Sequence, residues 1–503
     1  MQTNGRRAIA ALVSTLCVAG TSHAAGGPAA LLFNLEPLFN LEPFRDSSGL
    51  VATYDVNGRI DTRNPFFQSL GTNGRSCATC HVASQAMSIS PSDVRRRFEA
   101  THGQDPLFAP VDGANCATAK RSDRAGHSLL LQHGLIRVAL TLPEGTQFTI
   151  STVHDPYGCA LASSAGQVTV SVYRRPLPAT NLSFLSAVMW DGRETKSVLT
   201  GGDTFLANLN ADLADQANSA VMGHAQASVP PTSKQLNDIV RFELGLYTTQ
   251  VWDESAGALF LYGGHGDPVS LSRQDYYPGI NDSLGGNPTG EAFDSSAMQT
   301  FAAWTNAGMT PWDRNQDGHA HARRAVAAGE KIFNTAPLTI TDVRGLNDNA
   351  ALGKPASIQG TCTTCHDSPN VGDHSLPVPL DVGVGHPTLP NFEPDPNIAA
   401  ALAEVDAADL PVFRIDGCPD PFHPGQVNPI YTTDPGKALI SGQCADLNRM
   451  KGPVLRGLAA RAPYFHNGGA ANLLQVVEFY DKRFNMSLTA QQKSDLVAFL
   501  GSL

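Results

Sequence analysis

Two short stretches hold the residues best suited to chemistry, and both read Cys-x-x-Cys-His: residues 77–81 and residues 362–366. Two cysteines three residues apart lie on one face of a helical turn, where each sulfur can form a thioether with one vinyl group of the same haem. A histidine directly after the second cysteine can ligate the haem iron. We therefore predict two covalently bound haem c groups, attached through Cys77, Cys80, Cys362 and Cys365, with His81 and His366 as iron ligands.

Two other uses of such cysteine pairs fit less well. A zinc ribbon needs its two pairs about 15–20 residues apart, whereas these pairs lie in different halves of the chain. A thioredoxin-like redox pair needs no histidine directly after it. The pattern therefore favours haem attachment.

The composition indicates a folded protein of about two to four domains. Of 503 residues, 42% are hydrophobic and 16% are charged, and the formal net charge is −11. A net negative charge repels nucleic acid and favours a positively charged redox partner. We expect no nucleic-acid function.

The first 24 residues have the pattern of a secretory signal peptide. Arg6 and Arg7 precede a short apolar stretch, and Ser22-His23-Ala24 supplies a small-x-small cleavage site. The stretch is shorter than the about 20 apolar residues that a membrane helix needs. We expect an exported, periplasmic protein without a membrane span, whose mature chain starts near Ala25.

Export predicts disulfides among the cysteines that remain outside the signal segment and the two motifs. In an oxidising compartment we expect the pairs Cys116–Cys159 and Cys418–Cys444. Four buried thiols are the alternative.

The rest of the chain must position these groups. Residues 135–174 alternate apolar and polar side chains, which predicts a small β insertion. Helical patterns prevail at 205–250 and beyond, including helices at 320–334, after Asn472, and after the capping box of Thr489 and Gln492.

The turn-rich segment 265–318 marks a border between two haem units. Its run Asp313–Gly318 resembles a calcium loop, but Arg324 stands where a bidentate glutamate is required, so we favour an Asx-rich turn.

Further motifs resemble the bacterial dihaem cytochrome c peroxidases and their MauG-like relatives. The matching stretches follow the family order over most of the chain: Ser76–His81, residues 189–193 (Met-Trp-Asp-Gly-Arg), Gln216–Gln226, Thr361–His366 and Leu455–Gly468. The C-terminal run from Tyr480 onward also resembles the dihaem rubber oxygenases.

The resemblance implies a mainly α fold of two cytochrome c-like haem domains, residues 25–290 with the β insertion and residues 291–503. It implies that peroxide or dioxygen reacts at the haem on His81, near Gln216, and that the haem on His366 transfers electrons. Trp190 would lie between the two haems. A small cytochrome c or cupredoxin would donate the electrons, and a calcium ion would lie between the domains.

The chain departs from the peroxidases at one iron ligand. They carry methionine where Tyr480 stands, MauG-like proteins carry tyrosine there, and rubber oxygenases use the histidine that matches His466. Both Tyr480 and His466 are therefore candidate sixth ligands of the C-terminal haem, with Met450 and Met486 as further candidates nearby.

A second departure concerns proton transfer. The peroxidases carry a glutamate where Gln226 stands, and cleavage of a peroxide O–O bond needs a group that moves a proton. A carboxamide cannot titrate, whereas His224 can do so near neutral pH. We also expect Arg193 and Arg456 to pair with haem propionates, because a guanidinium matches a carboxylate.

Three functions follow from these residues. The first is a dihaem oxidoreductase that reduces hydrogen peroxide. The second is a dihaem oxygenase or a MauG-like oxidising enzyme, which Tyr480 and Gln226 favour. The third is a pure electron-transfer cytochrome in which both irons carry six protein or haem ligands.

Overall fold

The structure is a computed structural model that describes residues 38–195, 203–284, 291–309, 318–372, 379–394, 396–423 and 425–503. The expected signal peptide and most of the Asx-rich run Asp313–Gly318 lie outside these residues. Among the described residues, no helix combines the length and the apolar character that a membrane crossing requires.

The helices begin where their sequences offer capping side chains. Asn472 accepts a hydrogen bond from the backbone of Gln475, and Thr489 and Gln492 form the predicted capping box. The helix predicted at 320–334 is also present. The described α-helices are α1 (Pro91–Thr101), α2 (Ser128–His133), α3 (Asp203–Gly223), α4 (Ser233–Gly245), α5 (Pro268–Leu271), α6 (Ala320–Thr335), α7 (Pro396–Leu402), α8 (Ala438–Ser441), α9 (Leu473–Arg483) and α10 (Ala490–Gly501).

The described strands form four sheets, each built from antiparallel pairs. In sheet order they are β1 (Pro43–Arg45), β2 (Gly49–Asp55), β7 (Leu246–Asp253) and β8 (Gly257–Ala258); β10 (Ile358–Gly360) and β9 (Leu338–Ile340); β12 (Ile430–Thr432), β11 (Val412–Asp416) and β4 (Thr149–His154); and β3 (Ile136–Thr141), β6 (Gln167–Arg174) and β5 (Leu161–Ser164).

The expectation of a mainly α fold made of two cytochrome c-like haem domains is wrong. Helix makes up 31% and strand 16% of the structure, and residues 38–503 form one compact unit. Residues 246–253 show why the helical prediction failed. Their β-branched Thr248, Thr249 and Val251 favour a strand, and β2, far away in sequence, supplies the pairing partner.

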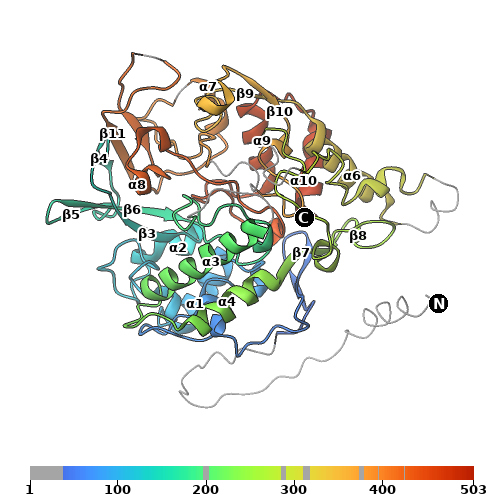
Figure 1. Cartoon of the computed structure of the whole chain (residues 1–503), viewed down its shortest axis with the longest axis horizontal. Helices are drawn as coiled ribbons and strands as arrows, with labels where there is room; N and C mark the ends of the chain where they lie inside the picture. Colours follow the sequence, from blue (N-terminus) through green and yellow to red (C-terminus); the bar gives the residue numbers. More distant parts are fainter. Residues whose placement is uncertain are drawn as a thin grey trace. The chain divides into compact units, whose positions relative to one another are not determined.

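The strands predicted over 135–174 are present as β3 to β6, but they do not form a separate insertion. Strand β4 pairs with β11 from the C-terminal half (Figure 1). Phe148, Val170 and Val172 share a buried cluster with Phe413 and Ile415. An antiparallel sheet with strands from both halves of the chain and a shared buried cluster thus bridge the predicted border near residue 290, and the border itself stays a prediction.

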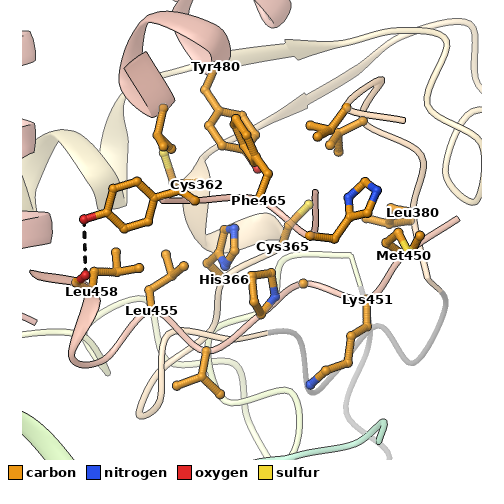
Figure 2. A pocket seen from close by; sticks show the side chains of 18 of the residues that line it. Cys362, Cys365, His366, Leu380, Met450, Lys451, Leu455, Leu458, Phe465 and Tyr480 are labelled. Carbon is orange, nitrogen blue, oxygen red and sulfur yellow. Dashed lines mark hydrogen bonds between the residues drawn. The ribbon is translucent and has the colours of Figure 1, made fainter. Parts of the chain in front are cut away.

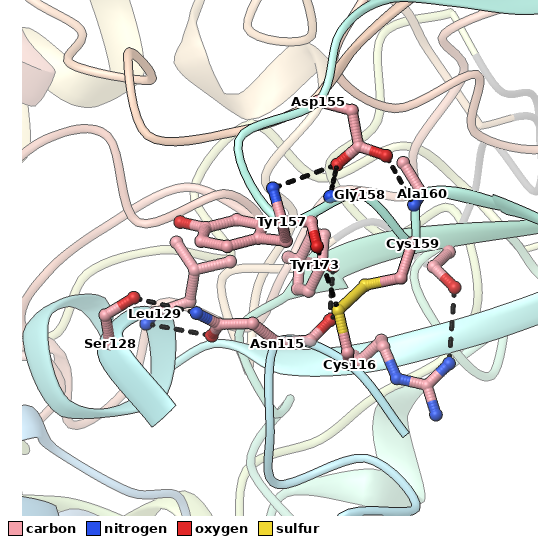
Figure 3. Close-up of a disulfide and its surroundings, with 12 residues drawn as sticks. Asn115, Cys116, Ser128, Leu129, Asp155, Tyr157, Gly158, Cys159, Ala160 and Tyr173 are labelled. Atoms are coloured by element: carbon pink, nitrogen blue, oxygen red, sulfur yellow. Dashed lines mark hydrogen bonds between the residues drawn. A yellow bond between two sulfur atoms is a disulfide. The ribbon is translucent and has the colours of Figure 1, made fainter. Parts of the chain in front are cut away.

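Both predicted disulfides are confirmed, Cys116–Cys159 and Cys418–Cys444. The first joins the segment before α2 to the turn between β4 and β5 (Figure 3). In that turn the Asp155 carboxylate accepts hydrogen bonds from the backbone amides of Tyr157, Gly158 and Ala160. The bridge therefore anchors a turn whose shape is already fixed locally.

The helices are packed in two groups that matter for the site. Helices α3 and α4 pack against each other, and α6 packs against α10, which also contacts α9 (Figure 1). Each group forms one wall beside a Cys-x-x-Cys-His motif.

Candidate functional site

The two Cys-x-x-Cys-His motifs have the same local conformation because their sequences carry the same hydrogen-bonding residues. In the first, the backbone amide of Ser76 donates to Thr79 Oγ1 at 3.0 Å and the amide of His81 donates to the Cys77 carbonyl at 3.0 Å. The corresponding bonds of residues 361–366 have the same lengths. Each motif is a tight turn that directs two sulfurs and an imidazole toward one cavity.

The motif histidines are held by one ring nitrogen and present the other. His81 Nδ1 donates to the Met87 carbonyl at 3.0 Å, and His366 Nδ1 donates to the Val371 carbonyl at 3.3 Å. A carbonyl can only accept, so Nδ1 carries the proton and Nε2 keeps its lone pair. Burial lowers the pKa of each histidine to about 4, which keeps the imidazole neutral. Neutral imidazole is the form that binds a metal ion.

The first motif opens into what we call the N-terminal cavity. Its lining includes the predicted residues Cys77, Cys80, His81, Trp190, Gln216 and His224. Gln226 is exposed and is not found among the described lining residues; its side-chain oxygen accepts from Asn73 at 3.3 Å. The structure therefore brings three of the four predicted catalytic residues to this cavity and leaves Gln226 outside.

The second motif opens into the C-terminal cavity. Its lining includes Cys362, Cys365, His366, His466 and Tyr480, together with Met450 and Met486. Figure 2 shows Tyr480 reaching down from its helix toward Phe465, with Cys362, Cys365 and His366 around the same space. All candidate ligands of the second haem thus meet in one place.

The two candidate sixth ligands differ in whether their metal-binding form is already present. His466 is buried, its Nε2 has no hydrogen-bond partner among the described residues, and burial lowers its pKa to about 4. Burial raises the pKa of Tyr480 and so disfavours the phenolate, with the charges of Cys365 and Cys362 adding to the effect. A neutral imidazole is already available, whereas the tyrosine must first lose a proton.

The two cavities share a wall, and Trp190 is part of it. Arg175, Pro176, Leu177, Pro178, Trp190, Lys451 and Val454 line both. The indole Nε1 of Trp190 donates to the Arg175 carbonyl at 2.7 Å, and the indole stacks edge-on against the His466 ring with centroids 6.1 Å apart. The sequence could name Trp190, but only the fold joins it to both cavities.

Buried ion pairs hold the segment that carries Trp190 in place. The buried Arg174 guanidinium binds Asp191, the residue after Trp190, and also Asp434 at 2.6 Å. Arg193 pairs with Asp191 at 2.9 Å. Because Asp434 belongs to the C-terminal half, this network ties the tryptophan segment to both halves of the chain.

Two buried arginines carry unbalanced positive charge beside the C-terminal cavity. The Arg175 guanidinium donates only to backbone carbonyls, for example that of Ile89 at 2.6 Å, and Arg461 likewise donates to the Val454 carbonyl at 2.7 Å. Neither forms an ion pair with a carboxylate in the described part of the chain. Burial lowers their pKa values to about 9 and about 10, and the charge of Arg461 lowers that of Arg175 further. Buried cations of this kind need an anion to offset their desolvation.

Haem fits these cavities. Paired thiols, a neutral imidazole and a mostly apolar lining match the porphyrin, and the arginines match its propionates. Of the two arginines that we expect to pair with propionates, Arg193 lines the N-terminal cavity and also pairs with Asp191 at 2.9 Å. Arg456 lies outside the described lining of both cavities and donates to the Pro369 carbonyl at 2.8 Å. Charge burial, which only the fold reveals, adds Arg175 and Arg461 as candidates.

The predicted proton carrier His224 belongs to a polar relay. Its Nδ1 donates to Asp112, and Arg75 donates to the other carboxylate oxygen. Burial alone would raise the pKa of Asp112, but the bond from His224 and the charge of Arg75 hold it below its ordinary value. The carboxylate therefore fixes which nitrogen of His224 carries the proton and leaves Nε2 free for proton transfer. No motif in the sequence had pointed to Asp112.

Glu243 is the second residue that prediction from the sequence missed. It is 5% exposed, lines the N-terminal cavity, and its Oε2 has no hydrogen-bond partner among the described residues. Burial raises its pKa to about 8. The sequence did contain a sign of this burial. Helix α4 has an apolar stripe formed by Leu236 and Ile239, with Leu246 just after the helix, and a charged residue at position 243 falls on that stripe.

Comparisons with known proteins identify relatives, although no protein-family model matches the chain. The cytochrome-c peroxidase IdrP2 of Denitromonas iodatirespirans is 31% identical over 152 residues, which are 29% of this chain and 36% of that protein. The cytochrome-c peroxidase IdrP1 of Pseudomonas sp. (strain SCT) is 22% identical over 312 residues, 56% of this chain and 71% of that protein. The cytochrome c551 peroxidase of Nitrosomonas europaea is 39% identical over 82 residues, 16% and 25% respectively. The chain is thus similar, over part of its length, to bacterial cytochrome-c peroxidases.

The family likeness predicted from the motifs is thereby confirmed. The chain spans 36% of the length of the first relative, about a third, and 71% of the length of the second. One solved structure, the hydrazine synthase of Kuenenia stuttgartiensis, covers 82% of the chain at 14% identity, but its TM-score of 0.27 supports no statement about the fold.

Proposed function

We propose that this protein is a periplasmic dihaem oxidoreductase that reduces hydrogen peroxide. One haem would be held in each cavity by the motif cysteines and histidine. The observation that carries the proposal is the shared wall: two haem-binding motifs, far apart in sequence, line cavities that have Trp190 and Arg175 in common. That arrangement suits transfer of electrons from one redox site to another.

The haem iron would supply the redox chemistry, and the chain would supply protons and positions. Peroxide reduction consumes two electrons and two protons, breaks the O–O bond and yields two waters. His224, oriented by Asp112, would exchange protons with the N-terminal cavity through its Nε2. Its side chain is 39% exposed, so it also reaches solvent.

In the C-terminal cavity, His366 and His466 would both be ligands of the haem iron. The neutral imidazole of His466, whose Nε2 has no partner in the described part of the chain, supports this choice over Tyr480. Arg175 and Arg461 would bind propionates. A small cytochrome c or cupredoxin would donate electrons, in keeping with the net charge of −11 that favours a basic partner.

A second candidate function is that of a dihaem oxygenase or MauG-like oxidising enzyme. It is supported by Gln226, which has no titratable group and lies outside the described cavity lining. If His224 and its neighbours do not replace the missing glutamate, peroxide would turn over slowly, and the enzyme would use dioxygen or oxidise a protein substrate instead.

The test is an EPR and visible spectrum of the purified ferric protein before and after one equivalent of peroxide, followed by turnover with a reduced cytochrome or cupredoxin. One high-spin and one low-spin haem, with rapid peroxide reaction and steady donor oxidation, are expected. Two low-spin haems unchanged by peroxide would identify an electron carrier. Stable dioxygen binding without peroxide turnover would identify the oxygenase.

A further inference from the structure

Helix α4 carries a carboxyl group where its pattern calls for an apolar side chain. Leu236, Ile239 and Leu246 belong to one apolar cluster, and Ile239 and Leu246 are buried. Glu243 lies between them, one turn after Ile239. The neighbouring Phe242 anchors this part of the helix, since its ring packs 5.0 Å from that of Phe66. Glu243 is therefore held inward by the helix and cannot reach solvent without disturbing that packing.

The carboxyl group has no charged partner that would explain its burial. Three other buried carboxylates among the described residues have charged partners: Asp191 and Asp434 bind Arg174, and Asp112 binds Arg75. Glu243 forms no ion pair in the described residues, and its Oε2 lacks a hydrogen bond there. It lines the N-terminal cavity near Cys77, whose pKa is raised first by burial and then by the charge of Glu243. A buried, unpaired carboxyl group is stable only when it is protonated.

The cavity thus contains two titratable groups in opposite surroundings. His224 is 39% exposed and paired with Asp112, so it can exchange protons with solvent. Glu243 is buried and has no ion-pair partner in the described residues, so it responds chiefly to charge that enters the cavity. A buried acid and a partly exposed imidazole in one cavity can divide the acid and base roles between them.

We propose that Glu243 is the proton store of the N-terminal cavity: it carries a proton when an electron enters the cavity and releases that proton as peroxide is reduced. This role rests on the proposed function. Each peroxide takes two electrons from the reduced donor protein and two protons. Glu243 gives one proton to a departing oxygen and becomes a carboxylate, and His224, which is partly exposed, passes the other proton in from solvent. A proton from solvent then restores the acid, so the group is unchanged after each cycle.

The experiment measures the midpoint potential of the N-terminal haem against pH in the holoprotein and in Glu243→Gln. Glutamine has the same shape but holds no exchangeable acid proton. In the wild type, the midpoint potential is expected to fall as pH rises over the range in which Glu243 titrates, with a slope that corresponds to one proton taken up per electron. In the variant, the potential is expected to be independent of pH over the same range. Peroxide turnover is expected to fall by about 10²-fold, the scale of a lost acid–base group.

The matched control is Glu330→Gln. Glu330 is also a buried glutamate, 3% exposed, but it accepts hydrogen bonds from the amides of Thr300 and Phe301 and lies outside the described lining of both cavities. This variant should keep the pH dependence of the midpoint potential and the rate of peroxide turnover of the wild type. An unchanged slope in Glu243→Gln would overturn the proposal.

Two further outcomes are separable. A wild type that does not turn over peroxide would remove the proposed function, whatever the slope. If Glu243→Gln fails to fold or to take up haem, redox-difference infrared spectra of the wild type decide instead: a carboxylic acid C=O band that changes on reduction supports the proton store, and its absence overturns it.

Discussion

The indole Nε1 of Trp190 donates a 2.7 Å hydrogen bond to the backbone carbonyl of Arg175. The amide of the same arginine donates to the carbonyl of His466, also at 2.7 Å. One residue thus links the tryptophan that lines both cavities to the histidine of the C-terminal cavity. The bond fixes the orientation of the indole in the shared wall.

Replacing Trp190 with phenylalanine should slow the passage of electrons between the two cavities. The smaller ring leaves a gap in the wall, and the Nε1–H···O bond is lost, so stability should fall by about 1–3 kcal/mol. Stopped-flow spectroscopy of the half-reduced protein mixed with peroxide measures the transfer rate. The control is Trp304→Phe, a buried tryptophan whose Nε1 donates to the Leu261 carbonyl at 3.0 Å. A similar stability loss with no change in rate is expected there; equal rates in both variants would contradict a role for Trp190.

Replacing His224 with glutamine should lower peroxide turnover by roughly 10²-fold or more, because proton transfer is lost while the side chain stays polar. Asp112→Asn should have a smaller effect of the same kind, since the amide no longer fixes the imidazole tautomer. Steady-state peroxide turnover with a reduced cytochrome as donor measures both effects. His154→Gln, on strand β4, is the control and should match the wild type.

The choice between the two candidate ligands can be read from spectra of the ferric protein. His466→Ala should change the EPR and near-infrared signals of the C-terminal haem, because the variant removes an imidazole whose Nε2 has no partner among the described residues of its cavity. Tyr480→Phe should leave them unaltered, since burial keeps its phenol protonated by raising its pKa. A spectrum that responds to Tyr480→Phe and not to His466→Ala would assign the ligand to the tyrosine.

The two disulfides close loops of different length, with sequence separations of 43 and 26. Loop-closure entropy predicts that Cys116→Ala/Cys159→Ala lowers the free energy of unfolding by about 4 kcal/mol, and Cys418→Ala/Cys444→Ala by roughly 3.5 kcal/mol. Urea unfolding followed by haem absorbance and by circular dichroism gives both values. Neither double variant should alter haem content, because the motif cysteines are untouched; loss of haem would show that the bridges are needed for maturation.

Burial raises the pKa of Glu330 to about 7, although hydrogen bonds from the amides of Phe301 and Thr300 oppose the shift. Between its ordinary value and about 7 the folded state keeps a proton that the unfolded state has lost, so stability falls as pH rises through this window. The loss is on the order of 3 kcal/mol. Glu330→Gln should flatten this part of the stability curve, as measured by urea unfolding at each pH. An equally steep curve in the variant would refute the assignment.

The conformation of the two Cys-x-x-Cys-His motifs depends on local sequence. Hydrogen bonds from Ser76 and Thr79, or from Thr361 and Thr364, shape each Cys-x-x-Cys-His turn without help from the rest of the chain. Helix caps at Asn472 and Thr489 were predictable for the same reason, since a cap depends on residues within one turn. The even number of remaining cysteines and the expectation of export predicted two disulfides, but the sequence alone could not prove which cysteines pair.

Several residues that line or miss the cavities could be identified only from the fold. Gln226 stands at the family's glutamate position, yet the bond from Thr72 to its carbonyl at 2.8 Å holds a left-handed backbone there and leaves its side chain exposed. Glu243, Asp112 and Arg175 come to the cavities from three separate segments. Strand β7 likewise exists because β2 pairs with it. Pairing and burial depend on partners distant in the chain, and the local sequence carries no record of where those partners lie.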